Sequence, residues 1–201
     1  MRRVSLPTLL LAAATGCSSE SPAPSPAWAP VPETALTQSQ VVQKAKALVA
    51  RDALFDRLMA RLTAVVQAEG PVAAIAVCQS EAPAIAETVG RENGVRIGRT
   101  SDKLRNARNQ PPDWAATSLA SRPTEPAFLA GPDGRFGALL PVRLKAQCLT
   151  CHGPTEAIPG PVREALADRY PQDRAVGYAE GDLRGWFWVE VAKESAETGR
   201  E

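Results

Sequence analysis

The chain has 201 residues, and its 23 Lys and Arg against 22 Asp and Glu give a formal net charge of +1 at pH 7. Nucleic-acid-binding proteins usually carry a clear basic excess, so we expect no nucleic-acid partner. No apolar run approaches the roughly 18 residues of a membrane-spanning helix. Since a domain often has about 150 residues, we expect one folded domain with shorter flanking segments.

The first 16 residues have the features of an export signal. Arg2 and Arg3 precede an apolar core that ends at Ala14, and the small residues Thr15 and Gly16 come directly before Cys17. A small residue followed by Cys resembles the lipobox of bacterial lipoproteins, in which the Cys becomes lipidated. The alternative is a plain secretory signal with an incidental Cys. We expect an exported, periplasmic protein, anchored at Cys17, with the outer membrane favoured because residue 18 is Ser rather than Asp.

A proline-rich segment follows the signal. Residues 21–32 (SPAPSPAWAPVP) contain five Pro and no charge, a composition typical of extended polyproline conformation. We interpret residues 17–32 as a tether, although a disordered N-terminus without a role has the same composition. The folded domain is predicted over residues 33–192, with a polar tail at 193–201.

Helical periodicity dominates the first half of the domain. Apolar residues at spacings of three and four over residues 34–69 predict one long helix or two abutting helices. Gly70-Pro71 ends this pattern, and Pro71 suits the first turn of a further helix that carries Cys78 on its apolar face. A third helix is predicted over residues 83–91, ending at Asn93-Gly94.

Strand patterns dominate the second half. Residues 95–99 and 186–191 have strand character, and residues 127–130 and 135–144 flank turn residues typical of a hairpin. Short helices are predicted over residues 111–119, 148–152 and 163–169. Helices followed by an antiparallel sheet of about four strands make an α+β fold.

The motif Cys148-Leu149-Thr150-Cys151-His152 is the attachment signature of c-type haem. Residues i and i+3 of a helical turn lie on one face, so both thiols can reach the two vinyl groups of one porphyrin. His152, the only His in the chain, then follows in position to bind the iron. The sequence therefore predicts one covalent haem c, held by Cys148 and Cys151 and ligated by His152.

Three other interpretations of this Cys pair remain open. A zinc site usually needs four ligands, and the chain has no second Cys or His cluster. A thioredoxin-like pair needs a βαβ setting, whereas this pair follows a predicted antiparallel hairpin. A structural disulfide is also compatible with export.

The second axial ligand of the iron has two candidates in the composition. Met59 lies on a helical apolar stripe, where Met usually fills the core. Cys78 is the Cys that remains after Cys17, Cys148 and Cys151 are assigned, but a buried free Cys is also common in cores. The residues alone leave both sulfurs open.

Five further stretches carry distinctive patterns: AIAVC (74–78), IGRTSDKLRN (97–106), NQPPDW (109–114), YPQD (170–173) and GYAEGDLRG (177–185). Together with the haem motif they resemble a family of exported c-type haem proteins with a PAS-like fold, over roughly residues 40–192. The resemblance implies Cys/His ligation of the haem iron, with Cys78 as the second axial ligand. Ala107 departs from the family, which often has Pro at this position.

Six cations and two acids fall within residues 91–108, a cluster with a net charge of +4 in a near-neutral chain. Because Arg suits carboxylates, we expect Arg99, Lys103 and Arg105 to bind the haem propionates. A solvated basic face is the alternative. Trp114 is a candidate for the wall of the haem pocket, although aromatic residues of this kind more often belong to the core.

We expect a monohaem cytochrome that transfers electrons in the periplasm to a redox partner protein. The alternative is a sensor of redox state or of a diatomic gas, which would act through a signalling partner, since the chain has no output region of its own. PAS-like folds are sensor scaffolds, but that is an argument from fold analogy. An enzyme is disfavoured, because no second His is present to act as a distal acid–base group.

Overall fold

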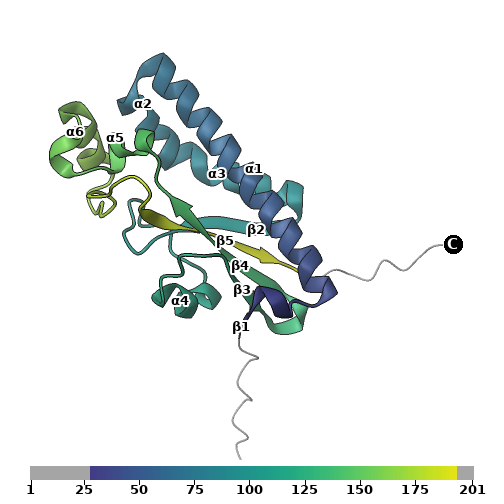
Figure 1. Ribbon diagram of the computed structural model, residues 1–201. Helices are drawn as coiled ribbons and strands as arrows, with labels where there is room; N and C mark the ends of the chain where they lie inside the picture. Colours follow the sequence, from purple (N-terminus) through teal and green to yellow (C-terminus); the bar gives the residue numbers. More distant parts are fainter. Residues whose placement is uncertain (1–27, 194–201) are drawn as a thin grey trace, which may run out of the picture.

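The computed structural model describes residues 28–193, and Figure 1 shows helices packed against an antiparallel sheet. This arrangement confirms the predicted α+β class. The predicted signal peptide, Cys17 and residues 194–201 of the predicted tail lie outside the described residues. The helices are α1 (Gln38–Glu69), α2 (Pro71–Ala76), α3 (Ala82–Asn93), α4 (Asp113–Ala120), α5 (Leu149–His152) and α6 (Gly160–Arg169).

The long helix α1 is continuous over 32 residues. It begins with a capping box, in which Thr37 Oγ1 accepts from the Gln40 amide and Gln40 Oε1 accepts from the Thr37 amide. It ends at Gly70, whose φ of +86° is readily accessible only to glycine. Neither α1 nor any other helix within residues 28–193 combines the length and apolarity needed to cross a membrane.

The sheet has five antiparallel strands in the order β1-β3-β4-β5-β2. Helices α1 and α3 pack on one face of the sheet, and α4 packs on the other. The segment with α5 and α6 lies beyond one end of the strands (Figure 1). The strands are β1 (Ala29–Val31), β2 (Val95–Thr100), β3 (Ala127–Ala130), β4 (Phe136–Arg143) and β5 (Leu183–Val191).

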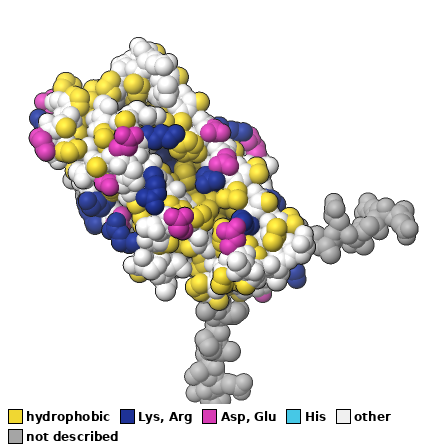
Figure 2. Space-filling model, viewed as in Figure 1, with side chains coloured by type: hydrophobic (Ala, Val, Ile, Leu, Met, Phe, Trp, Pro, Cys, Tyr) yellow, Lys and Arg dark blue, Asp and Glu magenta, His cyan; other side chains and the backbone are white. Residues whose placement is uncertain are grey.

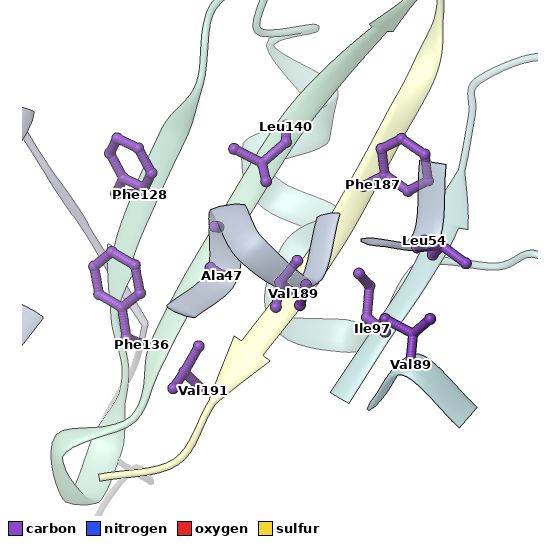
Figure 3. Close-up of a cluster of buried hydrophobic side chains, with 12 residues drawn as sticks. Ala47, Leu54, Val89, Ile97, Phe128, Phe136, Leu140, Phe187, Val189 and Val191 are labelled. Atoms are coloured by element: carbon purple, nitrogen blue, oxygen red, sulfur yellow. The ribbon is translucent and has the colours of Figure 1, made fainter. Parts of the chain in front are cut away.

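Side chains alternate between the two faces of the sheet, as the strand periodicity predicts. In β4, Phe136 and Leu140 join the cluster under α1, whereas Leu139 packs on the α4 side. Strand β5 places Phe187 and Val189 in the same α1-side cluster (Figure 3). Full burial of each large apolar side chain contributes roughly 1.5–3 kcal/mol, which makes this layer the main source of stability.

Strand β1 corrects the interpretation of residues 17–32 as a tether. Ala29–Val31 pair with β3, and the Trp28 ring stacks on Trp114 with 4.8 Å between centroids. The last residues of the proline-rich segment therefore belong to the sheet, which has five strands instead of about four. Pro30 is compatible with this because β1 is an edge strand, where a missing N–H breaks no interior ladder.

Candidate haem site

An apolar cavity of about 290 Å³ opens between α1, the α2–α3 connection and the segment with α5. In Figure 2 the hollow beside α1 shows hydrophobic side chains with Lys and Arg around them. Its apolar lining includes Phe55, Leu58, Leu62, Ile75 and Leu166. The cavity also brings together residues that are far apart in the sequence: Met59, Cys78, Cys148, Cys151 and His152.

The motif residues 148–152 form the helical turn that their spacing predicts. A short 3-10 turn over Ala146–Cys148 leads into α5, so Cys148 and Cys151 lie one turn apart, both half-buried. Their thiols are free, as is that of Cys78. The strands around the motif are all antiparallel, so the pair does not lie in a thioredoxin-like βαβ unit. No group of three or more potential metal ligands occurs among residues 28–193.

His152 is oriented by a backbone carbonyl. Its Nδ1 lies 2.7 Å from the carbonyl oxygen of Ala175, which can only accept, so Nδ1 carries the proton and Nε2 keeps its lone pair. Burial, reinforced by the positive charge of Arg105, lowers the pKa of His152 to about 3. The imidazole is therefore neutral at physiological pH and can bind a metal through Nε2.

Cys78 lies in a π-helix over Val77–Glu81 that joins α2 to α3. The sequence predicted an ordinary α-helix here, because a π-helix has no distinctive apolar period. Such wide turns frequently occur at functional sites. Burial raises the pKa of the Cys78 thiol, and the charges of Arg99, Arg105 and Arg184 partly oppose this shift. A metal that binds this sulfur would therefore displace a proton.

Met59 lines the same cavity from α1. The structure thus brings both candidate sulfurs, Met59 and Cys78, to the cavity that also holds His152. The choice between them rests on the chemistry of the two donors.

Four cationic side chains line the cavity without a carboxylate partner among the described residues: Arg99, Arg143, Lys145 and Arg184. Burial lowers the pKa of both Arg99 and Arg184, which means that the surroundings disfavour their charge. No acidic residue of the described part of the chain lines this cavity. The site therefore suits a ligand that is largely apolar and also carries negative charge.

Arg184 was not among the residues selected from the sequence. It lies at the start of β5, donates to the Lys103 carbonyl at 3.1 Å and covers the Tyr178 ring at 5.7 Å. It falls within the stretch GYAEGDLRG, but a single Arg has no spacing pattern that marks it as a ligand. Only the pairing of distant strands brings it to the cavity.

Two of the predicted pocket residues lie elsewhere. Lys103 is exposed, and its ammonium group lies over the ring of the buried Tyr178, 5.0 Å from the centroid. Trp114 lies on α4, on the opposite face of the sheet, and its Nε1 donates to Glu190 at 3.0 Å. Trp114 is therefore not a wall of this cavity, because the aromatic content of a segment does not determine which sheet face a side chain occupies. Lys103 is not among the residues that line the cavity, and its role as a propionate ligand stays a prediction.

Arg105 does line the cavity, but its guanidinium group is already engaged. It forms an ion pair with Asp173, with 2.9 Å between Nε and Oδ2, and donates to two backbone carbonyls. Nε and Nη2 are therefore committed to the protein, and among the described residues only Nη1 is left without a hydrogen-bond partner. The predicted role of Arg105 as a propionate ligand stays a prediction that depends on Nη1.

Comparison with known proteins gives two results. Residues 33–192 match a family model described as Tll0287-like. The crystal structure of the cyanobacterial heme-protein Tll0287 is similar in 57% of this chain and 71% of that chain, with 24% identity and a TM-score of 0.46. No curated protein matches the chain.

Proposed function

Because this chain belongs to the Tll0287-like family, which accounts for residues 33–192, we propose that it holds one haem c covalently. In this proposal Cys148 and Cys151 form the thioether bonds, and His152 binds the iron through Nε2. Cys78 would supply a sulfur as the second protein ligand of the iron.

The single observation that carries the proposal is the position of the motif. Cys148, Cys151 and His152 line one apolar cavity together with Cys78, and the imidazole already has the tautomer that leaves Nε2 free. A haem would supply reversible one-electron chemistry at this position.

The charges of the cavity also fit this cofactor. Haem is largely apolar and carries two propionates, and Arg binds carboxylates through paired hydrogen bonds. Arg99 and Arg184 are the best placed propionate ligands, because both are half-buried, line the cavity and lack a carboxylate partner within residues 28–193. Of these two, Arg99 was predicted from the sequence and Arg184 was not.

Covalent attachment is tested by producing the full chain with a cytochrome c maturation system. We expect haem to stay with the wild-type protein after acid–acetone extraction, with one haem per chain in the pyridine haemochrome spectrum. Replacing both Cys148 and Cys151 by Ala removes both thioether bonds and makes the haem extractable. A wild-type protein without covalent haem would overturn the proposal.

We propose electron transfer to a periplasmic redox protein as the function, without catalysis. A single haem with two protein ligands needs no substrate site, and His152, the only His in the chain, is used as a ligand. Export and a lipid anchor at Cys17 belong to the same proposal.

Sensing of redox state or of a diatomic gas is the second candidate, and the environment of Cys78 favours it. Burial raises the pKa of this thiol, so the protein itself favours the protonated sulfur, which would be a weak ligand for ferrous iron. An open coordination position would then accept CO or NO. Ready CO binding by the ferrous wild-type protein supports a sensor, whereas refusal of CO in both oxidation states supports an electron carrier.

A further inference from the structure

A buried ion pair lies directly behind His152. The Arg105 and Asp173 side chains are only 10% and 12% exposed, and their Nε and Oδ2 atoms lie 2.9 Å apart. Exposed pairs contribute little to stability, and even buried ones are often replaceable by apolar residues. The role of this pair therefore depends on the other groups that the two side chains bind.

Both members of the pair bind the backbone of Ala175, which is fully buried. Asp173 Oδ1 accepts from the Ala175 amide at 2.8 Å, and Arg105 Nη2 donates to the Ala175 carbonyl at 3.1 Å. This carbonyl is the one that accepts from His152 Nδ1 at 2.7 Å. The ion pair therefore fixes both the N–H and the C=O of Ala175, whose carbonyl oxygen is the hydrogen-bond acceptor of the imidazole.

Arg105 Nη2 also donates to the carbonyl of Cys151, which precedes His152 in the chain. One guanidinium group thus binds the backbone on both sides of the imidazole: the turn that carries His152 and the loop that orients it. The two segments are 23 residues apart. One of the two carbonyls, that of Ala175, accepts from His152 Nδ1, and the other belongs to the peptide bond between Cys151 and His152. An ion pair with a purely structural role would not need hydrogen bonds to both of these backbone segments.

We propose that Arg105 and Asp173 form a clamp that sets the tautomer and orientation of the His152 imidazole through the Ala175 carbonyl. They are positioning residues, because neither needs to touch the iron. The redox consequence of the clamp rests on the proposed haem function. A hydrogen bond from Nδ1 makes imidazole a stronger donor at Nε2, so loosening the clamp weakens the ligand and raises the reduction potential.

The test uses the full chain with ¹⁵N-labelled His, which gives signals from one residue because His152 is the only His. Arg105→Lys keeps the positive charge but replaces the planar guanidinium fork, whose Nε and Nη2 bind Asp173 and the two carbonyls, by a single ammonium nitrogen. In the haem-loaded protein we expect exchange of the Nδ1 proton with solvent to speed up on the order of tenfold. This factor corresponds to the free energy of about one lost charge-assisted hydrogen bond. The reduction potential rises in the same variant.

Arg57→Lys is the matched control, because Arg57 forms a half-exposed ion pair with Glu92 at 2.6 Å, between α1 and α3. We expect this variant to leave the proton exchange and the potential at their wild-type values. Asp173→Asn serves as the second variant if Arg105→Lys does not accumulate as folded protein, and it is expected to speed up the exchange as well.

Unchanged proton exchange and potential in the folded clamp variants, with only a lower melting temperature, would overturn the clamp. A wild-type protein without haem would overturn the proposed function instead. The clamp is then tested on the full chain alone, where wild-type His152 keeps its proton on Nδ1 and the clamp variants populate both tautomers.

Discussion

At the scale of single residues, the two sulfur atoms that are candidates for the second iron ligand would differ in charge when bound. Cys78 would bind as an anionic thiolate, which stabilises ferric iron, whereas the Met59 thioether is neutral. We expect Cys78→Ala to abolish a low-spin thiolate signal in the ferric EPR spectrum of the haem-loaded protein. The reduction potential is expected to rise by roughly tenths of a volt, which lies within the range of potentials that different axial ligands produce in haem proteins.

Met59→Leu is the matched control for this prediction, because it removes the other sulfur and nearly conserves side-chain volume. We expect its EPR spectrum and potential to equal those of the wild type. The reverse pattern, in which Met59→Leu changes the spectrum and Cys78→Ala does not, would assign the iron ligand to Met59.

At the scale of elements, strand β1 and Trp28 complete one edge of the sheet. Trp28 stacks on Trp114 and covers Gly131, where a Cβ atom would lie 2.7 Å from the indole ring. We expect Trp28→Ala to lower the free energy of unfolding by about 2 kcal/mol, less than the roughly 3–5 kcal/mol of a fully buried Trp, because Trp28 is only half-buried. Urea denaturation measures the loss.

Val42→Ala tests whether this loss is specific to the β1 edge. Val42 is 41% exposed on α1, so its truncation is expected to change the unfolding free energy by less than about 0.5 kcal/mol. An unchanged urea midpoint for Trp28→Ala would mean that β1 contributes nothing to the fold and acts as part of a tether.

At the scale of the whole molecule, lipidation at Cys17 would determine where the domain works. We expect the wild-type protein to incorporate labelled palmitate and to fractionate with bacterial membranes. Cys17→Ala is expected to lose the label and to appear as a soluble periplasmic protein. Cys78→Ala is the control, since it removes a Cys from the domain and keeps the label. An unlabelled wild type would contradict the anchor without affecting the haem proposal.

Local patterns in the sequence predicted most elements of the fold. The helix over 34–69, the hairpin of β3 and β4 and the turn at 148–152 depend on periodicity, turn residues and i, i+3 spacing within short segments. The motif residues Cys148, Cys151 and His152 share one such turn, so their common position could be predicted from spacing alone. Strand β1 was missed, because its pairing with β3 spans about a hundred residues and its prolines resemble a linker.

Only the tertiary structure decided what surrounds the motif. Arg184 reaches the cavity because β5 pairs with β4 and β2, whereas Trp114 faces away because α4 packs on the opposite side of the sheet. Arg105 belongs to the proposed clamp because residue 105, residues 173 and 175, and residue 151 of α5 converge from two loops and a helical turn. Composition specifies which charges a segment contains. The partner of each charge depends on which distant segments pack together, and local sequence periodicity does not determine that packing.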